Sequence, residues 1–178
     1  MTAAEQEAIA FVYELEKGYW AGNAASDPNP TLDGVTQKTY DHWRGLRGLA
    51  MRPVKQMTPE ERVTIYREYW ADCHAEQFDP RVAAIHFAFA FNAGPSAAAI
   101  PLQRAVGVKA DGKIGPITLA AVQAISPERL VPVLLVEQMT SYYGMAIEHQ
   151  RLRPNMTSWM GRLAAGWRRA GVRLREYA

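Results

Sequence analysis

Apolar residues recur at helical spacing through most of the chain. Thr2 and Glu5 form the pattern of a capping box, which predicts that a helix spans residues 3–17. The apolar side chains of this helix fall on one face: Ile9, Val12 and Tyr13. The hydrophobic pattern therefore predicts that the chain begins with an amphipathic helix packed on a core.

Similar start and stop signals predict further helices. Thr58-Pro59 opens a second helix, and Asp79-Pro80 opens a third whose run over residues 83–91 is apolar all round. A helix of that kind is typical of the buried centre of a fold, and Gly94-Pro95 ends it. Three more helices are expected: one through residues 102–106, a long one from Ser126-Pro127, and a last one over residues 156–176.

Evidence for strands is confined to one short segment. Residues 31–37 lie between turn-rich stretches and predict at most a short β-hairpin. The fold class is therefore mainly α, with a larger helical lobe, at most a short β-hairpin, and a small helical C-terminal lobe. The break at Gly94-Pro95 predicts a boundary between residues 1–94 and residues 95–178.

Composition excludes several classes of protein. The chain has 178 residues, 48% of them apolar, which suits a globular protein rather than a disordered one. No stretch reaches the roughly 18 to 20 apolar residues of a membrane span. The single cysteine, Cys73, excludes an internal disulfide framework. Residues 1–7 are acidic and lack the pattern of a signal peptide, so we expect synthesis in the cytoplasm without a signal peptide.

Charge is unevenly distributed along the chain. Residues 151–178 hold seven arginines and one glutamate, whereas residues 1–150 carry a net charge of −4. The last helix has an apolar stripe that includes Trp159 and Leu163, and its arginines lie largely off that stripe. Two interpretations follow: a solvated face, or a surface that contacts anionic wall or outer-membrane phosphates.

Glu16 is the most informative polar residue. It shares the apolar face of the first helix and lies in its last turn, at the negative end of the helix dipole. Both effects disfavour the charged carboxylate and are expected to raise its pKa. A carboxyl kept protonated near neutral pH suits the general acid of a glycosidase. The alternative is a glutamate at the rim of the core with its carboxylate in water.

From residue 16 onward the chain resembles a known family. Residues 16–19 (Glu-Lys-Gly-Tyr) are similar to the Glu-Gly-Gly-Tyr motif of the glycoside hydrolase family 108 lysozymes, and residues 34–36 (Gly-Val-Thr) fit the end of the loop that follows. Residues 65–70, 89–94 and 111–118 resemble later parts of the family, the last of them within a C-terminal peptidoglycan domain. Two departures stand out: Lys17 replaces a glycine of the motif, and the loop before residue 34 is shorter than in the family.

The resemblance implies a peptidoglycan hydrolase of the endolysin type, with a lysozyme-like catalytic lobe in residues 1–94 and a peptidoglycan-recognition lobe in residues 95–178. Such a protein would be made in the host cytoplasm and would act on the cell wall after holin-type or other release. Its catalytic glutamate carries over to Glu16, which would protonate the glycosidic oxygen between N-acetylmuramic acid and N-acetylglucosamine. Asp27 and Thr31 are the candidates for the second carboxylate and its threonine, with Asp33 and Thr36 as substitutes. The candidates for sugar contacts are Tyr19, Trp20, Thr36 and Asn92. The effect of Lys17 on Glu16 stays open, because a neighbouring cation opposes the effect of burial.

Other chemistries find little support. Cys73, His74 and His86 lack the paired spacing of a zinc site, and no phosphate-binding loop or nucleophile elbow is present, so we expect no metal and no cofactor. Residues 1–150 are net acidic and contain no recognised nucleic-acid-binding motif, which argues against a nucleic-acid partner. We expect a monomer whose partner is bacterial peptidoglycan. The alternatives are a lytic transglycosylase and a non-catalytic module that binds cell wall or nucleic acid.

Overall fold

Helices make up most of the structure, and a small sheet lies at one end. The computed structural model describes residues 1–22 and 29–171, apart from the side chain of Arg151. The α-helices in this part of the chain are α1 (Ala3–Glu16), α2 (Gln37–Gly45), α3 (Pro59–Asp72), α4 (Pro80–Ala93), α5 (Pro95–Ala105), α6 (Pro116–Gln123), α7 (Pro127–Glu148) and α8 (Met156–Arg169). The strands are β1 (Tyr19–Trp20), β2 (Thr31–Leu32) and β3 (Val35–Thr36), and 3₁₀ turns span Val54–Gln56, Ala75–Gln77 and Gln150–Asn155.

Side-chain caps fix the starts of the N-terminal helices. At α1 the Thr2 hydroxyl accepts a hydrogen bond from the Glu5 amide, and the Glu5 carboxylate accepts one from the Thr2 amide. Thr58 and Glu61 repeat this reciprocal arrangement at α3. These bonds satisfy amides that have no partner inside the helix. The predicted capping boxes are confirmed, and the prediction of a mainly α fold is confirmed with them.

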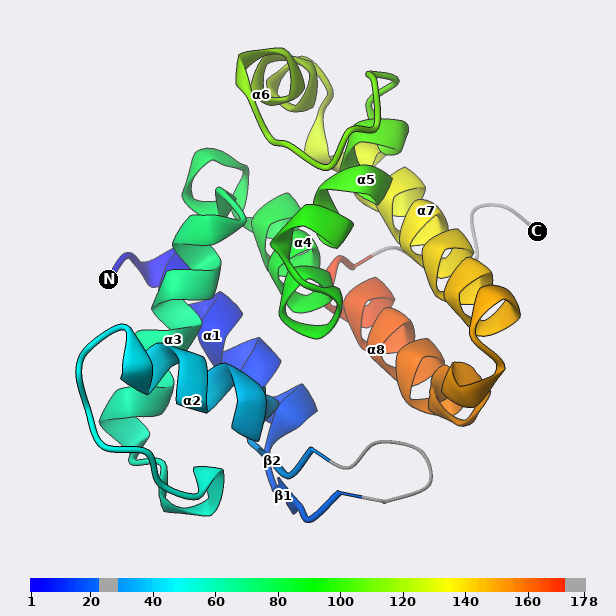
Figure 1. Cartoon of the computed structure of the whole chain (residues 1–178). Helices are drawn as coiled ribbons and strands as arrows, with labels where there is room; N and C mark the ends of the chain where they lie inside the picture. The colour runs from blue at the N-terminus through cyan, green and yellow to red at the C-terminus, as the bar shows by residue number, and fades with distance from the viewer. Residues whose placement is uncertain (23–28, 172–178) are drawn as a thin grey trace.

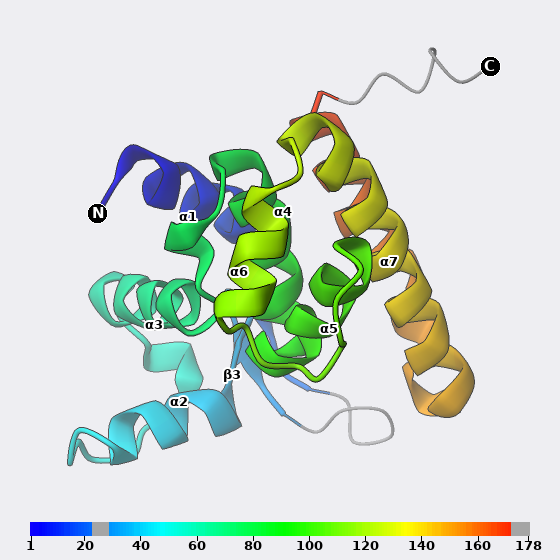
Figure 2. The same cartoon turned by 90° about the horizontal axis from the view of Figure 1, so that it is seen from above.

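Helix α4 is the centre of the fold. In Figure 1 it lies between α1, α2 and α3 on one side and α7 and α8 on the other. Its residues 82–91 are buried on every face apart from the half-buried Ala88, as the all-apolar run predicted. Seen from above, α5 and α6 cover one end of this assembly (Figure 2), and the small sheet lies at the opposite end.

The sheet is an antiparallel meander in the order β1-β2-β3. Thr31 pairs with Thr36 across the hairpin, and Trp20 pairs with Thr31 on the other side. The hairpin within residues 31–37 was predicted, whereas β1 was not. A strand of only two residues gives no alternating pattern by which a sequence could reveal it.

The last described helix returns along α7. Trp159 stacks on Tyr142 of α7, with ring centroids 4.7 Å apart, and Leu163 is buried one turn later. Gly166 follows, and a Cβ atom there would lie 3.1 Å from Ile85 of α4 and from Leu135 of α7. The apolar stripe predicted for the last helix is therefore a packing surface. The helix was predicted to end at residue 176, but α8 ends at Arg169 and residues 172–178 are outside the described part.

The described residues include no helix that is both long and apolar enough to cross a lipid bilayer.

Candidate active site

Glu16 lies at the C-terminal end of α1, where the chain turns into the sheet. Its helix packs against α4 through a face that includes the buried residues Ala8 and Val12. The Glu16 side chain continues this face and is only 10% exposed. Glu16 therefore lies on the apolar face of α1, as its helical spacing predicted.

Two adjoining hollows meet at Glu16. One has a volume of about 730 Å³ and extends along the sheet, and the other, of about 560 Å³, extends toward the end of α4. Both are lined by Glu16, Thr31, Gly34, Leu152 and Asn155. Together they form a groove with one carboxyl group near its middle, which is the arrangement that an enzyme acting within a polymer requires.

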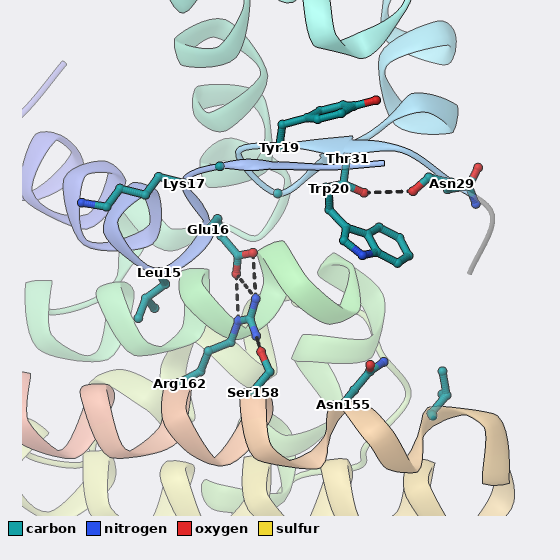
Figure 3. A pocket seen from close by; sticks show the side chains of 13 residues that line it. Leu15, Glu16, Lys17, Tyr19, Trp20, Asn29, Thr31, Asn155, Ser158 and Arg162 are labelled. Carbon is teal, nitrogen blue, oxygen red and sulfur yellow. Dashed lines mark hydrogen bonds and ion pairs between the residues drawn. The ribbon is translucent and has the colours of Figure 1, made fainter. Parts of the chain in front are cut away.

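The structure brings most of the predicted site residues that it describes to the groove. Tyr19 and Trp20 line the first hollow and are 46% and 42% exposed. The Trp20 ring lies on the same side of the sheet as Glu16, whereas the Tyr19 ring lies on the opposite side (Figure 3), where the Lys55 ammonium is 5.4 Å from its centroid. Thr36 and Asn92 line the second hollow. The Thr36 hydroxyl also accepts a hydrogen bond from the Thr39 amide at 3.1 Å, so it caps α2 as well.

The predicted second carboxylate is not among these residues. Asp27 lies outside the described part of the chain. Thr31, its proposed companion, lines both hollows, and its hydroxyl donates to the Asn29 carbonyl at 3.3 Å. Among the described residues that line either hollow, Glu16 is the one acidic side chain.

Asp33, a substitute candidate, has a structural role instead. It lies in the β2–β3 turn with a φ of 49°, and its carboxylate accepts hydrogen bonds from the Gly18 amide at 2.8 Å and from Arg62 at 2.7 Å. In return the Asp33 amide donates to the Gly18 carbonyl at 2.9 Å. These reciprocal bonds attach the end of α1 to the turn of the hairpin, and so they fix the backbone beside Glu16.

Gly34, next in the turn, packs directly on the candidate acid. Its φ is +74°, and a Cβ atom added there would lie 2.7 Å from the Phe91 ring and 2.9 Å from the Glu16 Cβ. Only glycine combines that backbone conformation with that approach. Gly34, the first residue of the Gly-Val-Thr segment, therefore shapes the site because it has no side chain.

A second charged residue, Arg162 of α8, contacts Glu16 directly. Its Nε donates to Oε1 of Glu16 at 2.8 Å, and its Nη2 donates to Oε2 at 2.7 Å (Figure 3). The Arg162 side chain is 16% exposed, and its guanidinium also contacts the Ser158 hydroxyl one turn earlier. Two parallel N–H···O bonds of this kind are the geometry in which an arginine holds a carboxylate most firmly.

Sequence reasoning missed this contact. Arg162 was assigned to a basic face lying off the apolar stripe of the last helix. A signal was present, since Arg162 directly precedes the buried Leu163 and therefore lies at the edge of that stripe. Nothing local connects it to Glu16, because 146 positions separate the two residues.

Lys17 does not contact the Glu16 carboxylate. Its ammonium donates to Glu14 at 2.6 Å, and this hydrogen bond raises the pKa of Lys17. Figure 3 shows its side chain directed away from Glu16. Lys17 therefore pairs with Glu14 on the surface of α1 and not with the candidate acid.

Two buried tyrosines complete the surroundings of the site. Burial raises the pKa of Tyr66 and of Tyr142, and the negative charge of Glu16 acts in the same direction on both. Both hydroxyls therefore stay neutral, and Tyr66 donates to the Asp33 carbonyl at 2.7 Å. Within residues 1–22 and 29–171, no three histidine, cysteine or acidic side chains gather where they could hold a metal ion.

Comparison with known proteins agrees with this geometry. The family model described as glycosyl hydrolase 108 matches residues 9–94, and the model described as a predicted peptidoglycan domain matches residues 97–169. The solved structure of Brucella abortus SagA superposes with a TM-score of 0.80 at 30% identity, covering 93% of this chain and 92% of SagA. The chain belongs to glycosyl hydrolase family 108. No curated protein sequence matches it significantly.

Membership of family 108 fixes the class of reaction and the fold. The chain has a mainly α, lysozyme-like fold and is a glycoside hydrolase that acts on peptidoglycan. The groove at Glu16 lies mostly on elements matched by the family 108 model, whereas Arg162 and Ser158 lie within residues matched by the peptidoglycan domain. Both halves of the chain therefore line one groove.

Proposed function

We propose that this family 108 protein is an N-acetylmuramidase that cleaves the β-1,4 bond between N-acetylmuramic acid and N-acetylglucosamine, with Glu16 as its general acid. One observation carries the proposal: Glu16 is a largely buried carboxyl at the junction of two hollows that together can hold a sugar on each side of it. A general acid must reach the oxygen between two sugar units, and this position suits that task.

The chemistry then follows the usual course of glycoside cleavage. Glu16 protonates the glycosidic oxygen while positive charge develops on the muramic acid ring. Asp27 would stabilise that charge or activate water, and Thr31 would orient the water. The exposed ring of Trp20 offers a face on which a sugar beside Glu16 can stack, whereas the Tyr19 ring lies on the other side of the sheet.

A lytic transglycosylase is the second candidate. It is favoured by the finding that Glu16 is the one acidic side chain among the described residues that line the groove. An enzyme of that class needs no activated water, because the muramic acid forms an internal anhydro ring. The two reactions leave different ends on the glycan.

Digestion of purified peptidoglycan tests both candidates. We expect the wild type to release reducing N-acetylmuramic acid ends, detected by mass spectrometry, and Glu16→Gln to lower the rate by about 10² to 10⁴, since the amide has no proton to give. Glu14→Gln is the matched control, because Glu14 is an exposed carboxylate on the same helix that pairs with Lys17.

Each outcome has a distinct meaning. Anhydro ends from the wild type would assign the protein to the transglycosylases. Cleavage at the wild-type rate by Glu16→Gln would remove Glu16 from the mechanism. Binding without any cleavage by the wild type would leave a wall-binding module.

The biological setting is also a proposal. An endolysin role, with release through a holin-type pore, is what the resemblance first suggested. Co-expression with and without such a pore, followed as culture turbidity, tests it: lysis that is independent of the pore would contradict it.

A further inference from the structure

The ion pair between Arg162 and Glu16 conflicts with acid catalysis in the unliganded protein. Both Glu16 oxygens accept hydrogen bonds from the guanidinium, at 2.8 and 2.7 Å. A carboxyl in such a pair is ionised and has no proton to donate. If Glu16 is the general acid, as proposed above, Arg162 must leave it before the reaction begins.

Movement of the whole helix is an unfavourable way to release Glu16. Helix α8 is anchored on both sides of Arg162, by Trp159 stacked on Tyr142 and by the buried Leu163 and Gly166. Lifting it would expose these apolar residues to water, which is strongly unfavourable. Rotation of the Arg162 side chain is the less costly route, because that side chain itself lines the 730 Å³ hollow.

The rotated guanidinium needs a new partner in the groove. Separating a buried charge pair without replacement leaves both charges uncompensated, which is strongly unfavourable. A planar guanidinium with paired donors matches a second carboxylate better than any neutral sugar hydroxyl. Peptidoglycan supplies carboxylates in two forms: the lactyl group of muramic acid where no peptide is attached, and the acidic residues of the stem peptide where one is.

We propose that Arg162 is a specificity-determining residue that exchanges the Glu16 carboxylate for a carboxylate of the bound glycan strand. The exchange frees Glu16 to take up a proton and act as the acid. A neutral glycan with the same β-1,4 linkage binds without triggering the exchange and is cleaved slowly. Recognition of the substrate's charge and activation of the acid are thus one event at one side chain.

Three substrates test the exchange: glycan strands that keep their stem peptides, strands stripped of stems so that lactyl carboxylates are free, and stripped strands whose lactyl carboxylates are converted to methylamides. We expect the wild type to cleave at least one anionic substrate about 10- to 100-fold faster than the neutral one, the worth of one charge-assisted interaction. A preference for stripped strands identifies the lactyl group, and a preference for stem-bearing strands identifies the peptide.

Arg162→Gln is the informative variant. It should lose this preference and cleave the neutral substrate at least as fast as the wild type does, because Glu16 no longer has to be released. Arg162→Lys should keep part of the preference, since it retains the charge but not the paired donors. Arg169→Gln is the matched control. Arg169 is also an arginine of α8 that pairs with a carboxylate of α1, that of Glu7 at 3.4 Å, but it lies outside the groove.

The results separate failure of this inference from failure of the proposed function. Equal wild-type rates on all three substrates would overturn the exchange, and so would a uniform loss of activity in Arg162→Gln, which indicates a structural role. Absence of cleavage of every substrate by the wild type would reject the muramidase proposal and this inference with it.

Discussion

His86 illustrates how burial of a single residue makes stability depend on pH. The ring is fully buried in α4, and its Nε2 donates to the Cys73 carbonyl at 3.2 Å. Its Nδ1 has no hydrogen-bond partner among the described residues. Burial lowers the pKa of His86 from 6.5 to about 4, so the folded protein holds the ring neutral.

The sign of the effect follows from proton binding. Between the two pKa values the unfolded chain takes up a proton at His86 and the folded chain does not. We therefore expect the free energy of unfolding to fall as pH drops from about 6.5 toward about 4. Of this fall, His86 contributes on the order of 2 kcal/mol between pH 7 and pH 4.5.

The variant His86→Gln isolates this contribution. Glutamine can still donate to the Cys73 carbonyl but does not titrate. Denaturant unfolding at the two pH values should show a smaller loss of stability for the variant than for the wild type, since other titrating groups are common to both. Parallel losses would contradict the assignment.

At the scale of elements, the hairpin turn and the end of α1 act as one unit. The Gly18–Asp33 hydrogen bonds join them, and the backbone of Gly34 packs closely against Phe91 and Glu16. Gly34→Ala should therefore move the Glu16 side chain. A displacement of about 1 Å in a catalytic group costs on the order of 10² in rate, so activity should fall by about that factor.

Gly48→Ala is the matched control for Gly34→Ala. Its φ of +64° imposes a similar backbone strain, but no atom lies within 4 Å of the added Cβ. Gly48→Ala should lose about 1 to 2 kcal/mol of stability from backbone strain alone. Gly34→Ala should lose more, because its Cβ also overlaps Phe91 and Glu16, and only Gly34→Ala should lose activity. Equal activities of the two variants would show that the contact with Glu16 is unimportant.

The same scale explains what the sequence can predict. Helix starts were predictable because capping side chains lie within three residues of the amides that they satisfy, as at Thr2 and Thr58. Helix α2 was not predicted, since it is a short and mostly polar segment whose Tyr40 and Trp43 are buried only by its tertiary neighbours. Glu16 was predictable from helical spacing, whereas Arg162 reaches it through the fold.

For the whole molecule, the core is continuous across residue 94. Phe89 of α4 contacts Tyr142 of α7 with ring centroids 4.7 Å apart, and Tyr142 in turn stacks on Trp159. The boundary between residues 1–94 and 95–178 stays a prediction. A shared core makes independent unfolding of the two parts unfavourable.

We therefore expect a single cooperative transition in calorimetry. Trp159→Ala removes a buried ring that packs on this core and should lower the stability of the whole protein by about 3 to 5 kcal/mol. Tyr143→Ala, the control, removes a 60% exposed ring next to Tyr142 and should cost less than about 0.5 kcal/mol. Two separate transitions, with Trp159→Ala shifting only one, would show that the lobes fold independently.

The proposed contact of the last helix with anionic phosphates is also a question for the whole molecule. Arg162 and Arg169 pair with Glu16 and Glu7 of α1, while Arg168 is exposed. Two of the described arginines of α8 are therefore already paired inside the protein. Salt-insensitive binding of the wild type to anionic vesicles or to whole cells would contradict the phosphate proposal.

The Arg162–Glu16 pair has a consequence for how such proteins evolve. The two matched family models meet near residue 95, which makes the halves look exchangeable, yet this contact joins one half to the other inside the groove. A recombination event that imported a new C-terminal half would replace the partner of Glu16 as well. Gene fusions that shuffle these halves should then persist only when a compatible residue arrives at the position of Arg162, so the two halves are expected to share one ancestry.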